Sequence, residues 1–345
     1  MGRIATHPSF RRARGSLLAR TLPPRRSPSR WPALLAALTI VLAGCGSAAS
    51  PSAGFPTSGP TSPPPVASGG APISVVDDEG TSIALPRPPQ RVVSLTPGTT
   101  EILFAIGAGS TVVATDEASD YPPDAVALPH VGDFGAVDIE RIIGLGADLV
   151  VAGGNAYTPR DAIERLRSLG IPVVVIYAAT VDGVLADIEL VGRAVGRDAA
   201  AGLLAAQVRR DLDALAAATL SLPRPRVFYE VDASATIYGP ADRSFLAEMV
   251  ELAGGQPVTS GSRDAFEIPL ERLIAADPEV IVLGDAAFGA TPDVVRQRPG
   301  WAVMTAVRQG AIRAVDDKLV TRPGPRLALG LRSLILAVHP DARLP

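Results

Sequence analysis

The sequence predicts an α/β protein with two lobes joined by one long helix. Three observations predict it. Short β-branched runs alternate with helical patterns, a long proline-free helical pattern separates two such sets, and one segment recurs 131 residues later. The chain has 345 residues, 47 % of them hydrophobic and 19 % charged, which is enough for two domains of ordinary size.

The first α/β set spans residues 73–178. Its expected strands are Arg91–Leu95, Val112–Thr115, Leu149–Ala152 and Val173–Ile176. Its expected helices are Thr99–Ile106, Ile139–Gly144 and Pro159–Leu169. Because strands and helices alternate, this set predicts a mostly parallel sheet that is covered on both faces.

The segment from Val181 to about Ala218 predicts one long helix, since it has no proline and its apolar residues recur at helical spacing. Three glycines are its weak points, namely Gly192, Gly196 and Gly202. Pro223 and Pro225 end it, so residues 179–222 are assigned to a backbone helix between the lobes.

The second α/β set spans residues 223–345. Its expected elements are Arg226–Val231, Phe245–Ala253, Leu270–Ala276, Val280–Leu283, Ile312–Val315 and Leu327–Val338. The segments Asp138–Val151 and Pro269–Val282 match in register, each with an apolar-Glu-Arg-apolar start, a short helix, a turn and a buried strand. This match predicts that the two lobes are related.

The repeat places Glu140 and Glu271 in the first turn of equivalent helices, where the helix dipole favours a negative charge. Neither glutamate has a cation three or four residues away on its own helix. Each is therefore available for an external partner, although a solvated surface carboxylate explains the pattern equally well.

The N-terminus predicts a lipoprotein signal peptide over residues 1–44. A stretch with eight arginines and no acid precedes an apolar run from Ala33 to Gly44, which is too short to span a bilayer. The run ends in Leu-Ala-Gly before Cys45, which resembles a bacterial lipobox and makes Cys45 the expected lipidation site. Residues 45–72 are rich in Pro, Ser and Gly and predict a disordered tether.

Composition excludes several classes of function. Residues 45–345 carry 24 basic and 35 acidic side chains, which argues against nucleic acid as a partner. One cysteine and three histidines exclude a disulfide framework and a histidine-rich metal site. The glycine-containing run Gly107–Thr111 follows a helix and precedes a strand, the wrong order for a dinucleotide loop. No catalytic triad is apparent, so we predict no enzyme activity.

Three segments carry a family resemblance: Arg91–Glu101, Ser119–Ala125 and Val131–Phe134. Together they resemble the ferric-siderophore and cobalamin binding proteins of ABC importers, the class III periplasmic binding proteins, and within them the vitamin B12 binders. The resemblance implies two Rossmann-like lobes joined by a single long backbone helix, with ligand in a cleft between them. It implies that Glu140 and Glu271 dock on permease arginines. We expect a monomer without a cofactor, and the anchor and tether described above predict a protein held outside the cytoplasmic membrane by its lipid.

Ligands of such lobes meet the loops at the carboxyl ends of the strands. The expected ligand contacts are Thr96, Phe134, Asn155, Tyr157, Tyr238, Phe266 and one of Asp316 and Asp317. Phe134 matches an aromatic wall of the vitamin B12 binders, and Phe266 lies one residue beyond the matching position of the second lobe. Ala118 and Gly153-Gly154-Asn155 stand where the resemblance leads one to expect aromatic residues.

The rival ligand is a ferric siderophore or haem, which are often anionic and favour arginine in the cleft. The arginines that could serve are Arg160, Arg263, Arg322 and Arg326. A ligand sensor or a tethered enzyme on the same fold is the alternative from another class of function.

Overall fold

The structure is a computed structural model that describes residues 71–133, 135–154 and 157–345. The expected signal peptide, tether, lipidation site Cys45, and the ligand contacts Phe134 and Asn155 therefore lie outside the described residues. Among the described helices, none combines the length and the apolar character that crossing a bilayer requires.

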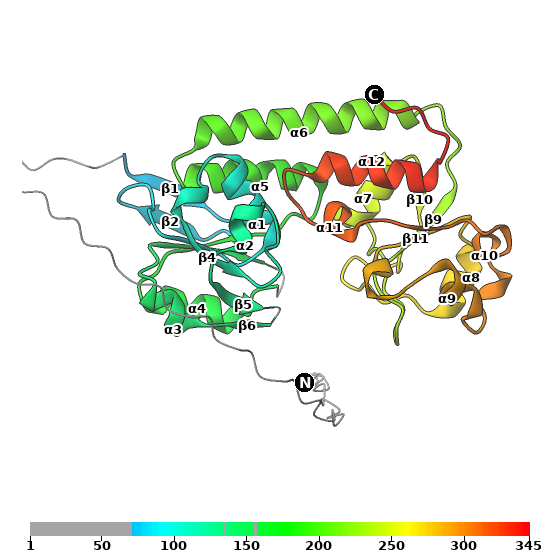
Figure 1. The fold of residues 1–345 in the computed structure, drawn as a ribbon, viewed down its shortest axis with the longest axis horizontal. Helices are drawn as coiled ribbons and strands as arrows, with labels where there is room; N and C mark the ends of the chain where they lie inside the picture. Colours follow the sequence, from blue (N-terminus) through cyan, green and yellow to red (C-terminus); the bar gives the residue numbers. More distant parts are fainter. Residues whose placement is uncertain (1–70, 134, 155–156) are drawn as a thin grey trace, which may run out of the picture. The chain divides into compact units, whose positions relative to one another are not determined.

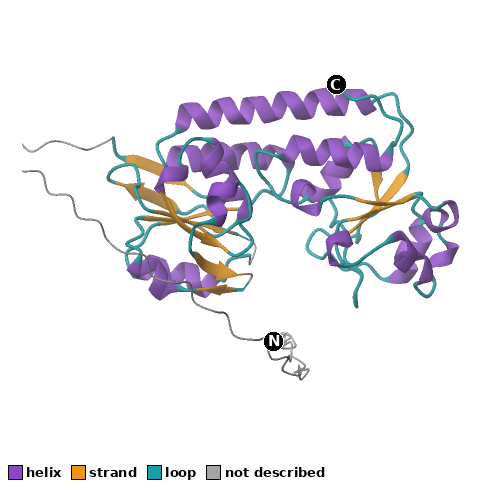
Figure 2. Ribbon diagram, in the orientation of Figure 1, coloured by secondary structure: helices purple, strands orange, loops and turns teal. Residues whose placement is uncertain are grey.

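The N-terminal lobe is built on a six-stranded sheet of order β6-β5-β4-β3-β7-β8 (Figures 1 and 2). Its strands are β3 (Val92–Ser94), β4 (Val112–Asp116), β5 (His130–Asp133), β6 (Ala136–Val137), β7 (Leu149–Gly153) and β8 (Val173–Ile176). All neighbours are parallel except β5 and β6. The expected strands and the mostly parallel sheet are confirmed, whereas β5 and the edge strand β6 were not predicted.

Helices cover both faces of this sheet. They are α1 (Pro97–Ala105), α2 (Pro123–Val126), α3 (Ile139–Gly144) and α4 (Arg160–Ser168), with a short 3₁₀ turn η1 (Gly109–Thr111). Side chains of β7 alternate between the two faces, since Leu149 and Val151 belong to one apolar cluster and Val150 and Ala152 to another. Both faces are therefore buried, as a parallel sheet requires.

An unpredicted hairpin, β1 (Ile73–Val76) and β2 (Ser82–Leu85), joins the N-terminal lobe beside β8. Its turn is fixed by Asp77, whose buried carboxylate accepts hydrogen bonds from Arg167 at 2.9 Å and from the Val175 N–H at 3.2 Å. The neighbouring Asp78 N–H donates to the Val175 carbonyl at 3.1 Å. The hairpin is thereby attached to the edge of the lobe at β8.

The prediction of one helix over Val181–Ala218 is wrong, because the chain reverses in the middle. Helix α5 (Val181–Ala194) ends before Gly196, which has φ +67°, and α6 (Asp198–Thr219) runs back along it. A left-handed conformation is accessible to glycine without strain, so the expected weak point becomes a turn. The two helices pack tightly, since a Cβ on Gly192 would lie 2.2 Å from that of Ala201.

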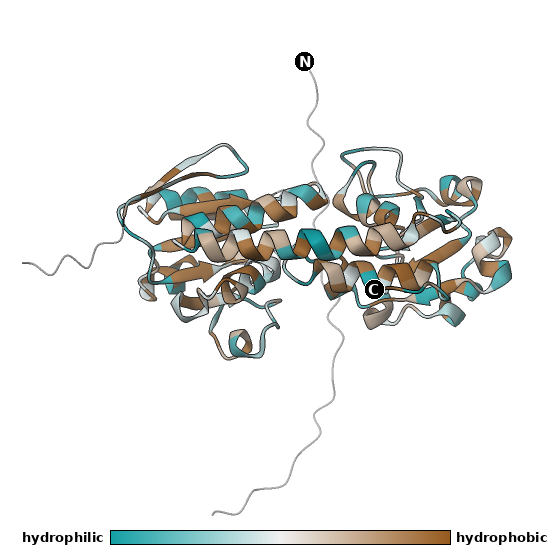
Figure 3. Ribbon diagram, turned by 90° about the horizontal axis from the view of Figure 1, so that it is seen from above, coloured by the Kyte–Doolittle hydropathy of each residue, from teal (hydrophilic) through white to brown (hydrophobic). Residues whose placement is uncertain are grey.

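Among the helices of the described residues, α6 alone extends over both lobes (Figures 1 and 3). It has 22 residues, packs on α5 along the first lobe, and contacts α7 (Phe245–Leu252) and α12 (Leu327–Val338) in the second. A single long helix thus connects the lobes, as predicted, while α5 belongs to the helical layer of the first lobe.

The C-terminal lobe has a four-stranded parallel sheet of order β10-β9-β11-β12. Its strands are β9 (Arg226–Glu230), β10 (Gln256–Pro257), β11 (Val280–Leu283) and β12 (Ile312–Ala314). Its other helices are α8 (Leu270–Ala276), α9 (Pro292–Gln297), α10 (Thr305–Gln309) and α11 (Asp317–Val320), with 3₁₀ turns η2 (Asp285–Phe288) and η3 (Trp301–Val303). All the elements expected in this lobe are present.

The sequence repeat corresponds to one structural unit in each lobe, α3-β7 and α8-β11. The Asp148 carboxylate accepts from the Arg91 N–H at 2.7 Å, and Glu279, which lies 131 residues later, accepts from the Arg226 N–H at 3.0 Å. Both arginines also donate from Nε to a backbone carbonyl at the end of α3 or α8, at 2.6 and 3.0 Å. The predicted relation between the lobes is therefore supported by shared hydrogen bonds.

Candidate functional site

A cavity of about 640 Å³ is lined by residues of both lobes. In the N-terminal lobe its walls are the loops after β3, β4, β7 and β8, and in the C-terminal lobe they include Val231, directly after β9. Backbone amides and side chains converge where parallel strands end, so the carboxyl edges of the sheets form the site, as predicted. Its volume is in the usual range for small-molecule sites.

Aromatic rings form much of the cavity wall, namely Tyr157 and Tyr177 from the first lobe and Phe245 and Phe266 from the second. The Gly153-Gly154 pair makes room for the tyrosines. A Cβ on Gly153 would lie 3.0 Å from Tyr157 Cδ1, and one on Gly154 would lie 3.0 Å from Tyr177 Cβ. The aromatic residue expected at this pair is thus replaced by rings from neighbouring positions.

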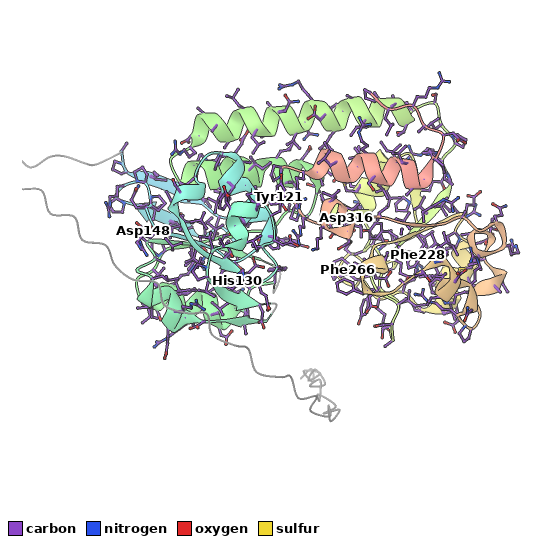
Figure 4. All side chains as sticks on the ribbon, in the orientation of Figure 1. Tyr121, His130, Asp148, Phe228, Phe266 and Asp316 are labelled. Carbon is purple, nitrogen blue, oxygen red and sulfur yellow. The ribbon has the colours of Figure 1, made fainter. Side chains whose placement is uncertain are left out.

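Three of the predicted ligand contacts line the cavity: Thr96, Tyr157 and Phe266. The Thr96 hydroxyl also caps α1, accepting from the Thr99 N–H at 3.2 Å. Tyr238 is not among the lining residues, although its backbone pairs with Asp232 and with Glu267, next to Phe266. Figure 4 shows Phe266 on the side of the C-terminal lobe that faces the other lobe.

Asp316 and Asp317 do not line the cavity, and their carboxylates serve local structure. Asp316 caps α11 by accepting from the Lys318 N–H at 3.1 Å. Asp317 accepts from the buried Tyr229 hydroxyl at 2.8 Å and from the Thr321 hydroxyl at 2.9 Å. Both carboxylates therefore have internal partners.

Sequence reasoning missed Tyr177 and Phe245. Tyr177 directly follows β8, and Phe245 is the first residue of α7 after its cap Ser244. Tyr177 could have been found by the rule that ligands meet the carboxyl ends of strands, because β8 was predicted correctly. The position of Phe245 depends on how α7 packs, so no sequence signal marks it.

A charged bridge joins the lobes at the edge of this cavity. Buried Glu101 of α1 accepts two hydrogen bonds from the Arg326 guanidinium, at 2.5 and 2.8 Å, and Arg322 Nη1 lies 3.6 Å from the same carboxylate. Arg322 also donates to Asp120 at 2.6 Å, and Lys318 pairs with Asp120. Burial alone would raise the pKa of Asp120, but the hydrogen bonds from Arg322 and Lys318 outweigh it and lower that pKa to about 2.

The Ser-Asp-Tyr-Pro-Pro run of residues 119–123 contributes side chains to this bridge between the lobes. Ser119 hydrogen-bonds to Thr100 at 2.7 Å and to Asp116, while Asp120 holds the two cations of the other lobe. The Tyr121 ring packs against Arg326, whose Cζ lies 4.1 Å from the ring centre. Figure 4 shows Tyr121 facing the C-terminal lobe. The motif therefore positions the lobes.

Of the four arginines considered as anion contacts, only Arg322 lines the cavity. Its guanidinium is already paired with Glu101 and Asp120. Arg326 is paired with Glu101, and exposed Arg160 is paired with Glu164 and Glu79. The described part of the cavity wall therefore offers no unpaired cation to an anionic ligand.

Two titratable groups of the wall have shifted pKa values. Burial and then the nearby Asp116 carboxylate raise the pKa of Tyr157 to about 12, and its hydroxyl donates to Asp116 Oδ2 at 3.4 Å. Burial and then the charge of Asp78 raise the pKa of Asp187 to about 9. Asp187 lies on α5, is 4 % exposed, and is protonated at neutral pH.

Replacing Asp187 with asparagine is expected to stabilise the protein, and more so as pH rises. An unfolded aspartate ionises near 3.8, whereas folded Asp187 keeps its proton to about pH 9, so unfolding releases a proton between these limits. Wild-type stability therefore falls with rising pH by up to about 1.4 kcal/mol per pH unit from this group. Asparagine does not titrate and avoids this loss.

Urea unfolding at pH 5, 6.5 and 8 measures this difference for wild type and Asp187→Asn. The control is Asp182→Asn, on the same helix but with a side chain that is 77 % exposed, and it should follow the wild type. A stability gain that stays constant or shrinks between pH 5 and 8 would show that Asp187 is not held protonated.

Glu140 and Glu271 are both exposed, and neither makes an ion pair or a side-chain hydrogen bond within residues 71–133, 135–154 and 157–345. They lie at equivalent positions of α3 and α8, one in each lobe. In Figure 1, α3 and α8 lie on the side of the lobes away from α6. Each carboxylate is thus available to a partner outside the chain.

Two lobes with mostly parallel sheets, one connecting helix and a cavity between the carboxyl edges define an ABC-importer solute-binding protein of the class III fold. The profile of the periplasmic binding protein family matches residues 92–319, and the chain belongs to that family. The family consists of extracytoplasmic proteins that bind small ligands and deliver them to permease subunits.

Proteins similar to this chain include two whose names state a ligand. An uncharacterized ABC transporter substrate-binding lipoprotein of Bacillus subtilis, YvrC, is 30 % identical over 90 % of this chain and 96 % of its own. The solved vitamin B12 binding protein BtuF of Vibrio cholerae is 27 % identical, with a TM-score of 0.64 over 73 % of this chain and 97 % of its own. The haem-binding protein RhuT of Roseiflexus is 28 % identical, with a TM-score of 0.66 over 74 % and 99 %.

Proposed function

We propose that this protein captures cobalamin, or a related corrinoid, between its lobes and delivers it to an ABC permease, without catalysing a reaction and without a cofactor. The observation that carries the proposal is the character of the cavity wall. It is largely apolar and aromatic, and its one described cation, Arg322, is already paired with two carboxylates. Such a wall suits a large, flat ligand whose edge bears uncharged polar groups.

The same wall argues against haem, which the similar protein RhuT binds. Haem carries two carboxylates that need cations, and its iron needs an axial ligand such as histidine, cysteine, methionine or a tyrosine phenolate. The described lining residues include no histidine, cysteine or methionine, which leaves Tyr157 and Tyr177 as candidate axial ligands, and the raised pKa of Tyr157 disfavours its phenolate form. Anionic ferric siderophores also need cations, and the described part of the wall offers them no unpaired one.

We further propose that Glu140 and Glu271 dock on basic residues of the permease. Their exposure, their lack of a partner among the described residues and their equivalence in the two lobes support this role. A carboxylate on each lobe gives two contacts that fix the orientation of the protein on its transporter. Lipidation at Cys45 and a monomeric state complete the proposal, and the lipoprotein YvrC supports the anchor.

Titration calorimetry with the full-length protein tests the ligand. Cyanocobalamin is expected to bind with one-to-one stoichiometry and at least about ten-fold more tightly than haem or ferric siderophores of the catecholate and hydroxamate classes, a difference of about 1.4 kcal/mol. Tighter binding of haem or of either siderophore would overturn the corrinoid assignment and leave the family assignment in place.

A further inference from the structure

Asp187 is an unusual residue for the wall of an apolar cavity. It projects from the middle of α5 and is 4 % exposed, and it lines the cavity together with Ile176 and Ala178. Burying a carboxyl group costs free energy unless the group has a polar partner. The partner of Asp187 among the described side chains is a second carboxyl group, that of Asp78, with which it shares a hydrogen bond.

Asp78 is held in place by the hairpin turn between β1 and β2. Its N–H donates to the Val175 carbonyl at 3.1 Å, and its Oδ2 accepts from the Tyr177 N–H at 2.6 Å. Tyr177 and Asp187 line the cavity, and Asp78, an exposed residue of the hairpin turn that is not among the lining residues, connects the Tyr177 N–H with the Asp187 carboxyl group. Because burial and Asp78 raise the pKa of Asp187 to about 9, the pair keeps a proton at neutral pH.

We propose that the hydrogen-bonded pair Asp78–Asp187 is a recognition subsite that accepts an N–H from an uncharged amide on the edge of the ligand and excludes carboxylates. This inference rests on the proposed function and names the ligand group that this wall selects. It concerns residues of α5 and of the β1–β2 turn, which no sequence signal marked as part of the site.

The chemistry of the pair gives this selectivity. A protonated carboxyl group has one O–H donor, and here the neighbouring carboxylate takes it, so the remaining lone pairs can only accept. An amide N–H₂ on the ligand can donate to them, and corrin rings bear such amides around their periphery. A carboxylate has no proton to donate and adds a negative charge beside Asp78, so like-charge repulsion and an unpaired polar group both oppose it.

The first experiment measures cyanocobalamin affinity by titration calorimetry at pH 7 with the full-length protein. Asp187→Leu keeps the size of the side chain but removes the acceptor, and its affinity is expected to fall at least about ten-fold, which corresponds to about 1.4 kcal/mol. Asp187→Asn restores an acceptor oxygen and is expected to rescue most of that loss. The control Asp182→Asn, exposed on the first turn of α5, should bind as the wild type does.

The second experiment tests the exclusion of carboxylates. The double variant Asp78→Asn/Asp187→Asn removes the negative charge but keeps hydrogen-bonding groups, and its haem affinity is expected to rise about ten-fold over wild type. Unchanged haem affinity would overturn the exclusion.

Two other outcomes separate this inference from the proposed function. If wild type binds cyanocobalamin and Asp187→Leu binds it equally well, the subsite is wrong and the proposed function stands. If wild type does not bind cyanocobalamin while it binds haem, both are overturned. Thermal melting of each variant shows whether a loss of affinity comes from unfolding. Asp187→Asn, which we expect to be more stable than wild type, keeps the proposal testable if Asp187→Leu does not fold.

Discussion

Replacing both Glu140 and Glu271 with arginine is expected to abolish ligand uptake by cells while ligand affinity stays at the wild-type level. Both side chains are exposed and lie on α3 and α8, away from the residues that line the cavity. Reversing two charges at a docking surface converts two attractive contacts into repulsive ones, and like charges placed against each other cost several kcal/mol. Uptake of radiolabelled cobalamin in cells that lack the native gene measures the effect.

The control for this experiment is Asp213→Arg, an exposed acid on α6, which should leave uptake unchanged. Each single glutamate variant should retain part of the uptake, because one docking contact remains. Normal uptake by the double variant would refute docking through these residues. It would also favour the alternative in which the protein acts as a ligand sensor on the same fold.

Replacing Glu101 with leucine is expected to destabilise the protein by about 3–5 kcal/mol. The Glu101 side chain is 1 % exposed, and it holds the guanidinium groups of Arg326 and Arg322 across the two lobes. Removing it leaves the Arg326 guanidinium, on a side chain that is 20 % exposed, without its carboxylate partner, while Arg322 keeps Asp120; the unpaired charge costs more than the lost attraction alone. The melting temperature should fall by roughly 10 °C.

Two further variants identify the cause of that loss. In Arg326→Leu/Glu101→Leu, the main ion pair is replaced by apolar side chains, so much of the lost stability should return. Glu189→Gln breaks an exposed pair with Arg193 on α5, and it should change stability by less than about 1 kcal/mol. A loss below about 1 kcal/mol for Glu101→Leu would show that the bridge between the lobes does not stabilise the fold.

The elements of both lobes were predictable because their signals are local. A buried parallel strand such as β7 is a short β-branched run, and a helix such as α3 follows a capping residue, Asp138, whose side chain accepts from the Arg141 N–H at 2.9 Å. The reversal at Gly196 was missed because apolar residues recur with helical spacing on both sides of it. In the sequence, a glycine within one continuous helix looks the same as a glycine at which the chain turns back. The two cases differ only in the elements against which the flanking helical segments pack.

By itself, the sequence determined the class of fold, the relation between the lobes, the two exposed glutamates, and the carboxyl edges of the sheets as the place for a ligand. The first three follow from the pattern of residues along the chain, and the fourth follows from the rule that ligands meet parallel-sheet lobes at the carboxyl ends of the strands. The tertiary structure alone decided that Arg322 is neutralised by Glu101 and Asp120, and that Asp187, which lines the cavity, meets Asp78. Those partners are 109 to 221 residues apart, and no local pattern encodes which distant charges will meet when the lobes fold together.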